Sequence, residues 1–306
     1  MLHRKLFALV PIIGISLLGA CNESQPIVDA SYKFESVDSF VSSRDIDIPV
    51  TVVRPLTDSD ETFPLVILAH GHGGSRNESG AYKQLAESLA TQGIASIRMD
   101  FPGCGDSSES FANNNLSNML DDIRASQVFA LSQPQIDASR VGLHGWSMGA
   151  RLVLTLSTEY DYKAITTWAP SAHPGADSML DFFGGTAAYE EMKATAIQDG
   201  FAPFTTIWGQ DQKLGPGFFS DLEESVPLDI VSEYEGALLV LYGEFDEVVL
   251  PEEAAALVNA ASKSSNLVSH MVQGANHGFG IFSDEPHLTR EAIDTTVDFL
   301  RQELGL

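Results

Sequence analysis

The sequence predicts an α/β fold with a mainly parallel central sheet that is flanked by helices and carries an inserted cap. Two observations lead to this prediction. Short apolar runs alternate with helical patterns through residues 31–306, as expected where crossover helices join parallel strands. The 306 residues are 44% hydrophobic and 19% charged, which suits one enlarged globular domain and excludes a coiled coil or a disordered chain over most of the length.

The first 20 residues have the composition of a secretory signal. Basic residues at 3–5 precede an apolar run over residues 6–18. These 13 residues, at about 1.5 Å each in a helix, do not cross a hydrocarbon core of about 30 Å, so a permanent transmembrane helix is the weaker alternative. The run ends in Leu-Gly-Ala-Cys at 18–21, which resembles the lipobox of bacterial lipoproteins. An ordinary signal peptide followed by a chance cysteine is the alternative.

The lipobox resemblance implies cleavage before Cys21 and attachment of lipid to the thiol of this residue. Residues 1–20 are then a signal peptide, and the polar residues 21–30 tether the domain to a membrane. The expected localisation is the bacterial cell envelope, as a lipid-anchored periplasmic or outer-membrane protein. With Cys21 modified, Cys104 has no partner for a disulfide, because the chain has two cysteines.

The charge of the chain restricts its partners. Lys and Arg number 17 against 42 Asp and Glu, which gives a net charge of −25. A field of this sign repels phosphate backbones, so nucleic acid is not an expected partner. The acidity does not identify a substrate, and the sequence leaves the oligomeric state open.

Within residues 31–306, apolar runs predict eight strands. The run at 65–69 is continuous, as in a strand that is buried on both faces of a sheet. Two earlier runs are expected to open the sheet. The predicted strands cover residues 32–41, 46–53, 65–69, 94–97, 141–144, 164–168, 237–242 and 267–272.

Helical periodicity fills the segments between most of these strands. Apolar residues recur at i, i+3, i+4, i+7 and i+8 through residues 82–90, and Gly93 is placed to end that helix. Proline favours the first turn of a helix, which indicates another helix near Pro251. The remaining predicted helices cover residues 116–132, 150–157 and 289–304.

Residues 172–235 interrupt this order, and we interpret them as a cap inserted into the domain. Gly-Gly at 184–185 and Gly-Pro-Gly at 215–217 signal turns, and no clear parallel strand is present. A second core layer with irregular connections is the alternative, because aromatic residues usually lie in a core. The aromatic residues of this segment include Phe182, Phe183, Phe201, Phe204, Trp208, Phe218 and Phe219.

Residues 145–149 read Gly-Trp-Ser-Met-Gly and stand between a predicted strand and an apolar helix. The pattern G-x-S-x-G in this context predicts a nucleophile elbow, a strained and crowded turn that needs glycine on both sides of the serine. The sequence therefore indicates Ser147 as a catalytic nucleophile.

A nucleophilic serine needs a base, and the base needs an orienting acid, in the chain order serine, acid, histidine for this architecture. Asp246 and His277 each lie in the turn after one of the last two predicted strands. We predict that His277 is the base and Asp246 the acid. Glu244, in the same turn, and Asp211, within the cap, are the rival acids.

Acyl transfer also needs two backbone donors for the oxyanion. Met148, directly after the serine, supplies one. The second is assigned to His72, within the sequence His-Gly-His-Gly-Gly at 70–74, where glycines let the backbone approach a substrate. A metal site built from His70 and His72 is the competing interpretation, but no Cys or carboxylate ligand is nearby, and no metal is expected.

Together the motifs resemble the α/β-hydrolase superfamily over nearly all of the predicted domain. They are HGHGG at 70–74, DFPGCGDS at 100–107, GWSMG at 145–149, GEFDEVV at 243–249 and GANHGF at 274–279. The resemblance is greatest to the cinnamoyl and feruloyl esterase-like branch, which has relatives among the serine aminopeptidases and dienelactone hydrolases.

The likeness to that branch rests on the D-x-x-G-x-G-x-S loop and on residues 213–215 and 218–222 of the cap. Cys104 departs from it, since another small or polar residue often stands there. Dienelactone hydrolases have a cysteine nucleophile at the elbow, where this chain has Ser147, so the likeness to them is weaker.

The motifs and the resemblance imply a serine carboxylesterase that works through an acyl-enzyme intermediate and needs no cofactor. A cap rich in aromatic residues suits an aromatic or short-chain acyl group, so the expected partner is a small-molecule ester. A serine peptidase similar to the aminopeptidases is the alternative, although the sequence shows no anchor for a peptide terminus. A non-catalytic binding protein of the envelope, built on the same scaffold, is a further alternative.

Overall fold

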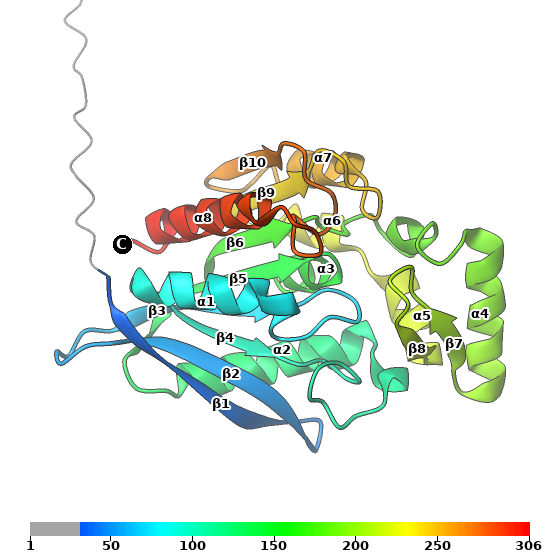
Figure 1. Cartoon of the computed structure of the whole chain (residues 1–306), viewed down its shortest axis with the longest axis horizontal. Coiled ribbons are helices and arrows are strands. Elements are labelled where there is room, and N and C mark those ends of the chain that lie inside the picture. The colour runs from blue at the N-terminus through cyan, green and yellow to red at the C-terminus, as the bar shows by residue number, and fades with distance from the viewer. Residues whose placement is uncertain (1–30) are drawn as a thin grey trace, which may run out of the picture.

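An eight-stranded sheet forms the centre of the computed structural model, which describes residues 31–306 (Figure 1). The strand order is β1-β2-β4-β3-β5-β6-β9-β10. β2 runs antiparallel to both of its neighbours, and the other adjacent strands are parallel. The predicted fold class is confirmed. The predicted signal peptide (1–20), tether (21–30) and lipidated Cys21 lie outside the described residues.

Every predicted strand is present, and most are longer than the apolar runs that predicted them. The largest difference is in β5, which begins at Ile136, where it pairs with Phe63. Its first five residues are half-buried or exposed, so they form no apolar run. The strands are β1 (Lys33–Ser43), β2 (Ile46–Leu56), β3 (Phe63–Ala69), β4 (Ala95–Met99), β5 (Ile136–Trp146), β6 (Tyr162–Trp168), β9 (Ala237–Gly243) and β10 (Leu267–Val272).

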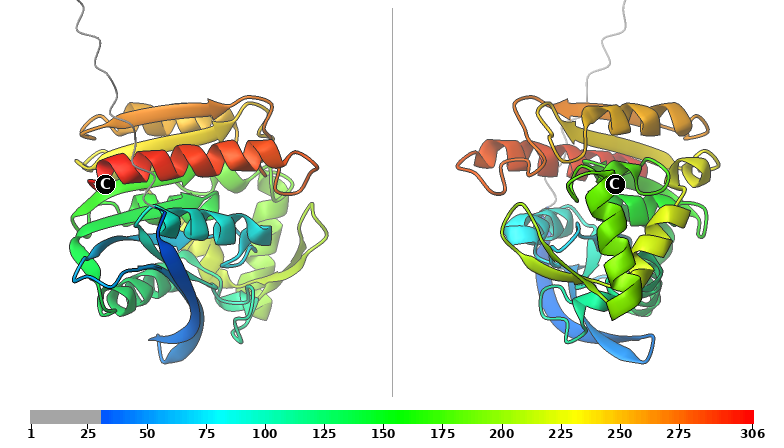
Figure 2. Two further views of the ribbon diagram at one scale, coloured as in Figure 1. Left: turned by 60° about the vertical axis from the view of Figure 1, so that its left-hand side comes forward. Right: turned by 90° about the vertical axis from the view of Figure 1, so that its right-hand side faces the viewer.

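Helices cover both faces of the sheet, and alternate side chains of a central strand pack against opposite helical layers. On β3, Val66 and Leu68 pack beneath one helical layer, and Leu65 and Ile67 pack beneath the other. α1 (Ala81–Thr91) and α8 (Pro286–Glu303) form the first layer, and α2 (Leu116–Leu131), α3 (Met148–Thr155) and α7 (Pro251–Ala260) form the second (Figures 1 and 2). No helix within residues 31–306 is both long and apolar enough to span a membrane.

The cap segment leaves the central sheet after β6 and returns to it at β9. β7 and β8 pair as an antiparallel hairpin of their own, and Figures 1 and 2 show this hairpin and α4 to one side of the sheet. Strands of four residues produce no apolar run of the kind that predicted the central strands. The elements of the segment are η3 (Asp177–Met179), α4 (Thr186–Asp199), β7 (Ala202–Thr205), β8 (Asp211–Leu214), α5 (Pro216–Glu224) and α6 (Pro227–Val231).

Four loops meet at the edge of the sheet nearest the cap. They follow β3, β5, β9 and β10, which all run in the same direction. Because parallel strands end at one edge of a sheet, residues far apart in sequence are brought together there. Two short helices lie in the loops on this side: η1 (Glu78–Gly80) after β3 and η2 (Phe111–Asn113) after β4.

Candidate active site

Ser147 occupies the sharp turn between β5 and α3. Its backbone has φ 57° and ψ −116°, a combination that residues with a side chain adopt only under strain. A Cβ atom on Gly145 would lie 2.3 Å from the carbonyl oxygen of Gly149, and one on Gly149 would lie 2.0 Å from the carbonyl oxygen of Ala69. Glycine is therefore required at both positions, as a nucleophile elbow demands.

His277 and Asp246 form a buried hydrogen-bonded pair. Nδ1 of His277 donates to Oδ2 of Asp246 at 2.9 Å, and the two residues are 6% and 3% exposed. Oδ1 of Asp246 accepts the backbone N–H groups of Val248 and Val249 at 2.9 and 2.8 Å. These amides fix the carboxylate, and the carboxylate fixes the imidazole with Nε2 left as its basic nitrogen.

The two rival acids have other partners. Oε2 of Glu244 accepts the backbone N–H of Gly274 at 2.9 Å. Asp211 accepts the hydroxyl of Thr205 at 2.7 Å, within the cap hairpin. Of the three candidate acids, Asp246 is the one that the fold brings to His277.

Ser147 and His277 line the same cavity, which has a volume of about 400 Å³ and lies between the sheet and the cap. Trp146, next to the serine, contacts both the histidine ring and its backbone. The two rings are 5.7 Å apart, and Nε1 of Trp146 donates to the carbonyl oxygen of His277 at 3.2 Å. This contact fixes the loop after β10 against the elbow.

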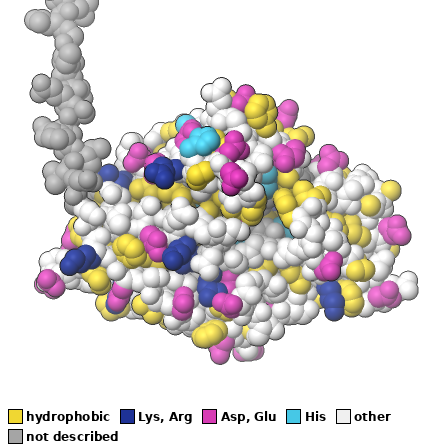
Figure 3. Space-filling view, in the orientation of Figure 1, with side chains coloured by type: hydrophobic (Ala, Val, Ile, Leu, Met, Phe, Trp, Pro, Cys, Tyr) yellow, Lys and Arg dark blue, Asp and Glu magenta, His cyan; other side chains and the backbone are white. Residues whose placement is uncertain are grey.

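The cavity has an apolar wall and a polar wall. Residues 71–75, Glu78, Ser79 and Gln210 form most of the polar wall, and the apolar wall consists of Met179, Phe182, Trp208, Val248, Val249 and Phe282. At the mouth, Trp208 is 52% exposed and Phe282 is 59% exposed, with 6.5 Å between their ring centroids. Figure 3 shows hydrophobic side chains gathered around a hollow on this side of the molecule.

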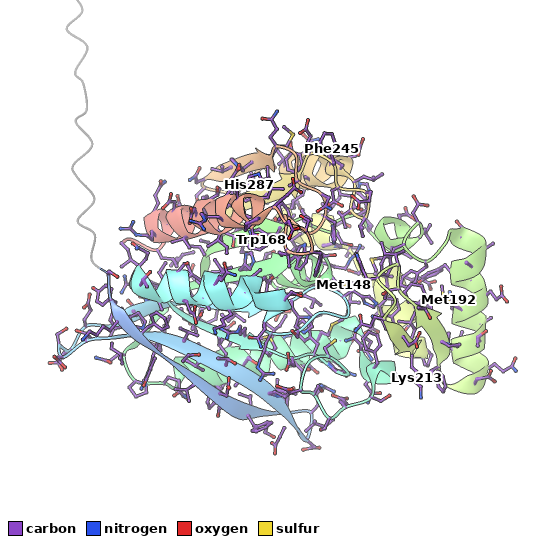
Figure 4. All side chains as sticks on the ribbon, in the orientation of Figure 1. Met148, Trp168, Met192, Lys213, Phe245 and His287 are labelled. Atoms are coloured by element: carbon purple, nitrogen blue, oxygen red, sulfur yellow. The ribbon has the colours of Figure 1, made fainter. Side chains whose placement is uncertain are left out.

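The amides assigned to the oxyanion come from two segments, the start of α3 and the loop after β3. Met148 is the first residue of α3, so its N–H has no partner within the helix. Figure 4 shows Met148 at the boundary between the central body and the cap. Within residues 31–306, neither this amide nor that of His72 donates a hydrogen bond to another group. Both are thus available to a ligand.

His70 fixes the backbone of the loop that contains His72. Its Nδ1 donates to the carbonyl oxygen of Gly71 at 2.8 Å, and its Nε2 accepts the backbone N–H of Phe101 at 3.1 Å. Burial lowers the pKa of His70 to about 4, so the ring is neutral at pH 7. His72 binds a different partner, and the described residues contain no group of three or more His, Cys, Asp or Glu side chains placed to hold a metal.

Glu78 is a site residue that the sequence did not indicate. Its side chain is buried, and its Oε1 accepts the backbone N–H of Gly71 at 2.7 Å. Burial raises the pKa of Glu78 to about 8. The residue lines the cavity and has a positive φ of 40°. A strained, buried acid in a cleft is typical of functional sites, but no sequence motif indicates it.

The loop after β4 supports the same region. Asp100 accepts the backbone N–H of Arg76 at 2.7 Å and that of Asp106 at 2.9 Å, while the Arg76 guanidinium pairs with both carboxylates. A Cβ on Gly105 would lie 2.3 Å from the Asp100 carboxylate, which explains this glycine of the D-x-x-G-x-G-x-S pattern. Cys104 is buried beside Asn114, and burial raises the pKa of its thiol.

Comparison with known sequences finds one matching family and one similar curated protein. The family described as serine aminopeptidase S33 matches residues 60–196. The quorum-quenching protein AidA of Acinetobacter baumannii is 28% identical over 145 residues. That alignment covers 47% of this chain and 46% of AidA, so the chain matches about half the length of this relative.

Solved structures of esterases share the fold. Est1E from Butyrivibrio proteoclasticus with bound ferulic acid superposes with a TM-score of 0.72 at 19% identity, over 88% of this chain and all of that one. The esterase domain of a Rhodothermus marinus protein gives 0.60 at 21% identity, over 89% of this chain and 100% of the domain. The chain has the α/β-hydrolase fold, and the comparisons support a hydrolase.

Proposed function

We propose that this chain, an α/β hydrolase by its fold, is a serine hydrolase that cleaves carboxylic esters. The observation that supports the proposal most is the pairing of His277 with Asp246 beside a cavity that Ser147 also lines. The alternative acids are engaged elsewhere, and the serine has the strained backbone of a nucleophile elbow.

In the proposed mechanism, Oγ of Ser147 attacks the ester carbonyl while Nε2 of His277 takes its proton. The amides of His72 and Met148 stabilise the negative oxygen of the tetrahedral intermediate. His277 then gives the proton to the departing alcohol, which leaves an acyl group on Ser147. Water, deprotonated by His277, releases the acid and restores the serine, while Asp246 stabilises the imidazolium in both halves.

The cavity favours an apolar group of modest size next to the reacting carbonyl. A volume of about 400 Å³ lies at the low end of ligand pockets, and six apolar side chains form one wall. An aromatic or short-chain acyl ester fits these dimensions. The acidic surface seen in Figure 3 and the net charge of −25 disfavour strongly anionic substrates.

A peptidase is the second candidate, because the matching family is described as serine aminopeptidase. Purified enzyme should be assayed with p-nitrophenyl esters of graded chain length, methyl ferulate and aminoacyl p-nitroanilides. We expect ester cleavage to exceed anilide cleavage. Faster anilide cleavage would support the peptidase, and no cleavage of either class by folded protein would support a binding role.

We also propose that the chain is a lipid-anchored protein of the bacterial envelope, on the basis of the sequence at 18–21. The mature protein is then expected to begin at Cys21 and to partition into detergent, and Cys21→Ser should release it. Mass spectrometry of the mature N-terminus tests this. An unmodified Cys21, or a mature start at another residue, would contradict the proposal.

A further inference from the structure

The imidazole of His72 is held in an aromatic cage at the junction of the sheet and the cap. The ring centroids of Phe111, Phe182 and Phe218 lie 5.5 to 5.8 Å from it. Nδ1 of His72 is buried and has no hydrogen-bond partner among the described residues. Burial lowers the pKa of His72 to about 4, so the ring is neutral at pH 7 and carries one proton.

Through that proton, the loop forms a hydrogen bond with the cap. Nε2 of His72 donates to Oε1 of Gln212, a buried residue of β8, at 2.7 Å. The two residues are 140 positions apart in the sequence. An apolar side chain would fill the aromatic cage without leaving Nδ1 unpaired, so the bond to Gln212 is the contact that an imidazole adds there.

The same glutamine begins a second connection to the loop. Nε2 of Gln212 donates to Oε1 of Gln210 at 3.2 Å, and Nε2 of Gln210 donates to the carbonyl oxygen of Gly73 at 3.0 Å. The approach is close: a Cβ on Gly73 would lie 2.4 Å from Nε2 of Gln212 and 2.6 Å from Oε1 of Gln210. Two side chains of the cap hairpin thus hold two consecutive residues of the loop.

The amide that the proposed mechanism uses belongs to the first of these two residues, His72. The N–H of His72 must lie about 2.7 to 3.1 Å from an oxyanion to stabilise it. This N–H is bonded to the Cα that carries the imidazole held by Gln212, and the carbonyl of Gly73, held by Gln210, follows one residue later. His70 holds the carbonyl oxygen of the same peptide group, so a loosened hairpin displaces the donor from the side of the His72 Cα, even when the cavity stays apolar and open.

We infer that Gln212, with Gln210 behind it, is a positioning residue for the oxyanion hole, so that the cap contributes to the rate of reaction as well as enclosing the substrate. This inference rests on the proposed function. It assigns the cap hairpin a part in transition-state stabilisation, because a charge on the oxyanion develops only after the substrate is bound.

The kinetic consequence separates this role from substrate binding. Gln212→Leu removes the acceptor for His72 and puts an apolar side chain of similar size in its place. We expect kcat to fall by about 10- to 100-fold and KM to change less than threefold. This fall in kcat is no greater than the fall caused by removing an entire oxyanion donor. Lys213→Ala is the matched control, since this exposed residue lies next to Gln212 on the outer face of the hairpin (Figure 4). Its kcat should match that of the wild type.

A trifluoromethyl ketone, which adds to serine and forms an oxyanion, provides an independent readout. Its affinity for Gln212→Leu should fall in proportion to kcat, whereas the affinity of the matching methyl ketone should not. If only KM rises and the trifluoromethyl ketone binds as before, the hairpin merely lines the cavity and the inference is wrong.

A double-mutant cycle tests the bond itself. His72→Leu keeps the backbone amide and removes the tie to Gln212, so it should lower kcat as Gln212→Leu does. The double variant should be no slower than the slower single variant, because both changes break one interaction. Multiplicative losses would show that the two side chains act separately and would overturn the inference.

Two further variants serve as a substitute and as a control. If Gln212→Leu fails to fold, Gln210→Met serves instead, because Gln210 is exposed and its change should lower kcat without lowering the melting temperature. Ser147→Ala distinguishes the two proposals. Activity that survives Ser147→Ala contradicts the proposed function, whereas an inactive Ser147→Ala beside a fully active Gln212→Leu contradicts only the role of the hairpin.

Discussion

His277 donates its Nδ1 proton to Asp246 across 2.9 Å, although the two residues are 31 positions apart in the sequence. They meet because β9 and β10 are adjacent and parallel, and each residue follows the carboxyl end of its strand. The pair is almost fully buried, and two backbone amides hold the carboxylate from the other side. The imidazole therefore has one orientation, which is the requirement for a base that serves a fixed nucleophile.

Asp246→Asn should lower kcat by several orders of magnitude and leave the fold intact. The amide keeps the shape of the carboxylate, but it does not stabilise the imidazolium and it favours the wrong tautomer of His277. Glu244→Gln is the matched control, because its partner is the backbone of Gly274. Steady-state kinetics on a p-nitrophenyl ester measures both. Wild-type turnover by Asp246→Asn together with an inactive Glu244→Gln would reverse the assignment of the acid.

Ser147→Gly should be inactive and more stable than the wild type. A positive φ of 57° is unfavourable for serine, and glycine adopts it without strain, so a gain of about 1 kcal/mol is expected. Ser147→Ala, also inactive, keeps the strain and is the control. Thermal unfolding followed by circular dichroism should give the order glycine variant above alanine variant. Equal or reversed melting temperatures would show that the elbow stores no strain.

Glu78 should impose a loss of activity at alkaline pH. Burial raises the pKa of Glu78 to about 8, so the side chain is neutral at pH 7 and becomes negative as the pH rises through that value. A negative charge bonded to Gly71 repels the oxyanion that forms beside His72. The kcat of the wild type should therefore fall above about pH 8, and that of Glu78→Gln should not. Identical profiles for the two enzymes would contradict this role.

His144 should make the fold sensitive to acid. This residue of β5 is fully buried, and burial lowers its pKa to about 3. Between about pH 6.5 and 3 the unfolded chain binds a proton that the folded chain does not, so stability is complete above pH 6.5 and is lost as the pH falls. From pH 6.5 to 4 the loss attributable to this residue is on the order of 3 kcal/mol.

Comparison with His144→Leu isolates that loss. Urea unfolding of both proteins at several pH values should show the wild type losing more free energy of unfolding than the variant on acidification. His70 and His72, whose pKa values burial also lowers, are present in both proteins. Their effect on the pH dependence of stability therefore cancels when the variant is compared with the wild type. Parallel curves for the two proteins would mean that His144 is not a source of acid lability.

Trp208 and Phe218 should behave differently when truncated. Trp208 is 52% exposed and lines the cavity, so Trp208→Ala should change the preference among ester chain lengths by about 1 to 3 kcal/mol and leave the melting temperature within a degree or two. Phe218 is fully buried, so Phe218→Ala should cost roughly 3 to 5 kcal/mol of folding free energy.

Chain-length profiles and melting curves for the two variants check this pair of expectations. An early-melting Trp208→Ala with an unchanged profile would remove the main support for a cap that selects the acyl group. A stable Phe218→Ala would show that the cap relaxes around the missing ring.

The order of the central strands and of the helices that flank them was determined by the sequence alone, because each depends on local periodicity. The continuous run at 65–69 became β3, and the repeat at 82–90 became α1. The elbow around Ser147 was predicted from five consecutive residues, although the carbonyl oxygen that crowds Gly149 belongs to Ala69 of β3. The periodic elements and the pentapeptide motif could therefore be predicted without knowledge of distant residues.

The partners of buried polar groups were decided by the tertiary structure. The bond from His72 to Gln212 and the burial of Glu78 depend on segments that only the folded chain brings together. Sequence patterns record how hydrophobic residues repeat within one element, but a single glutamine or glutamate has no repeat. The role of such a residue depends on the low dielectric and the few polar partners around its side chain. Both conditions exist only after packing excludes water.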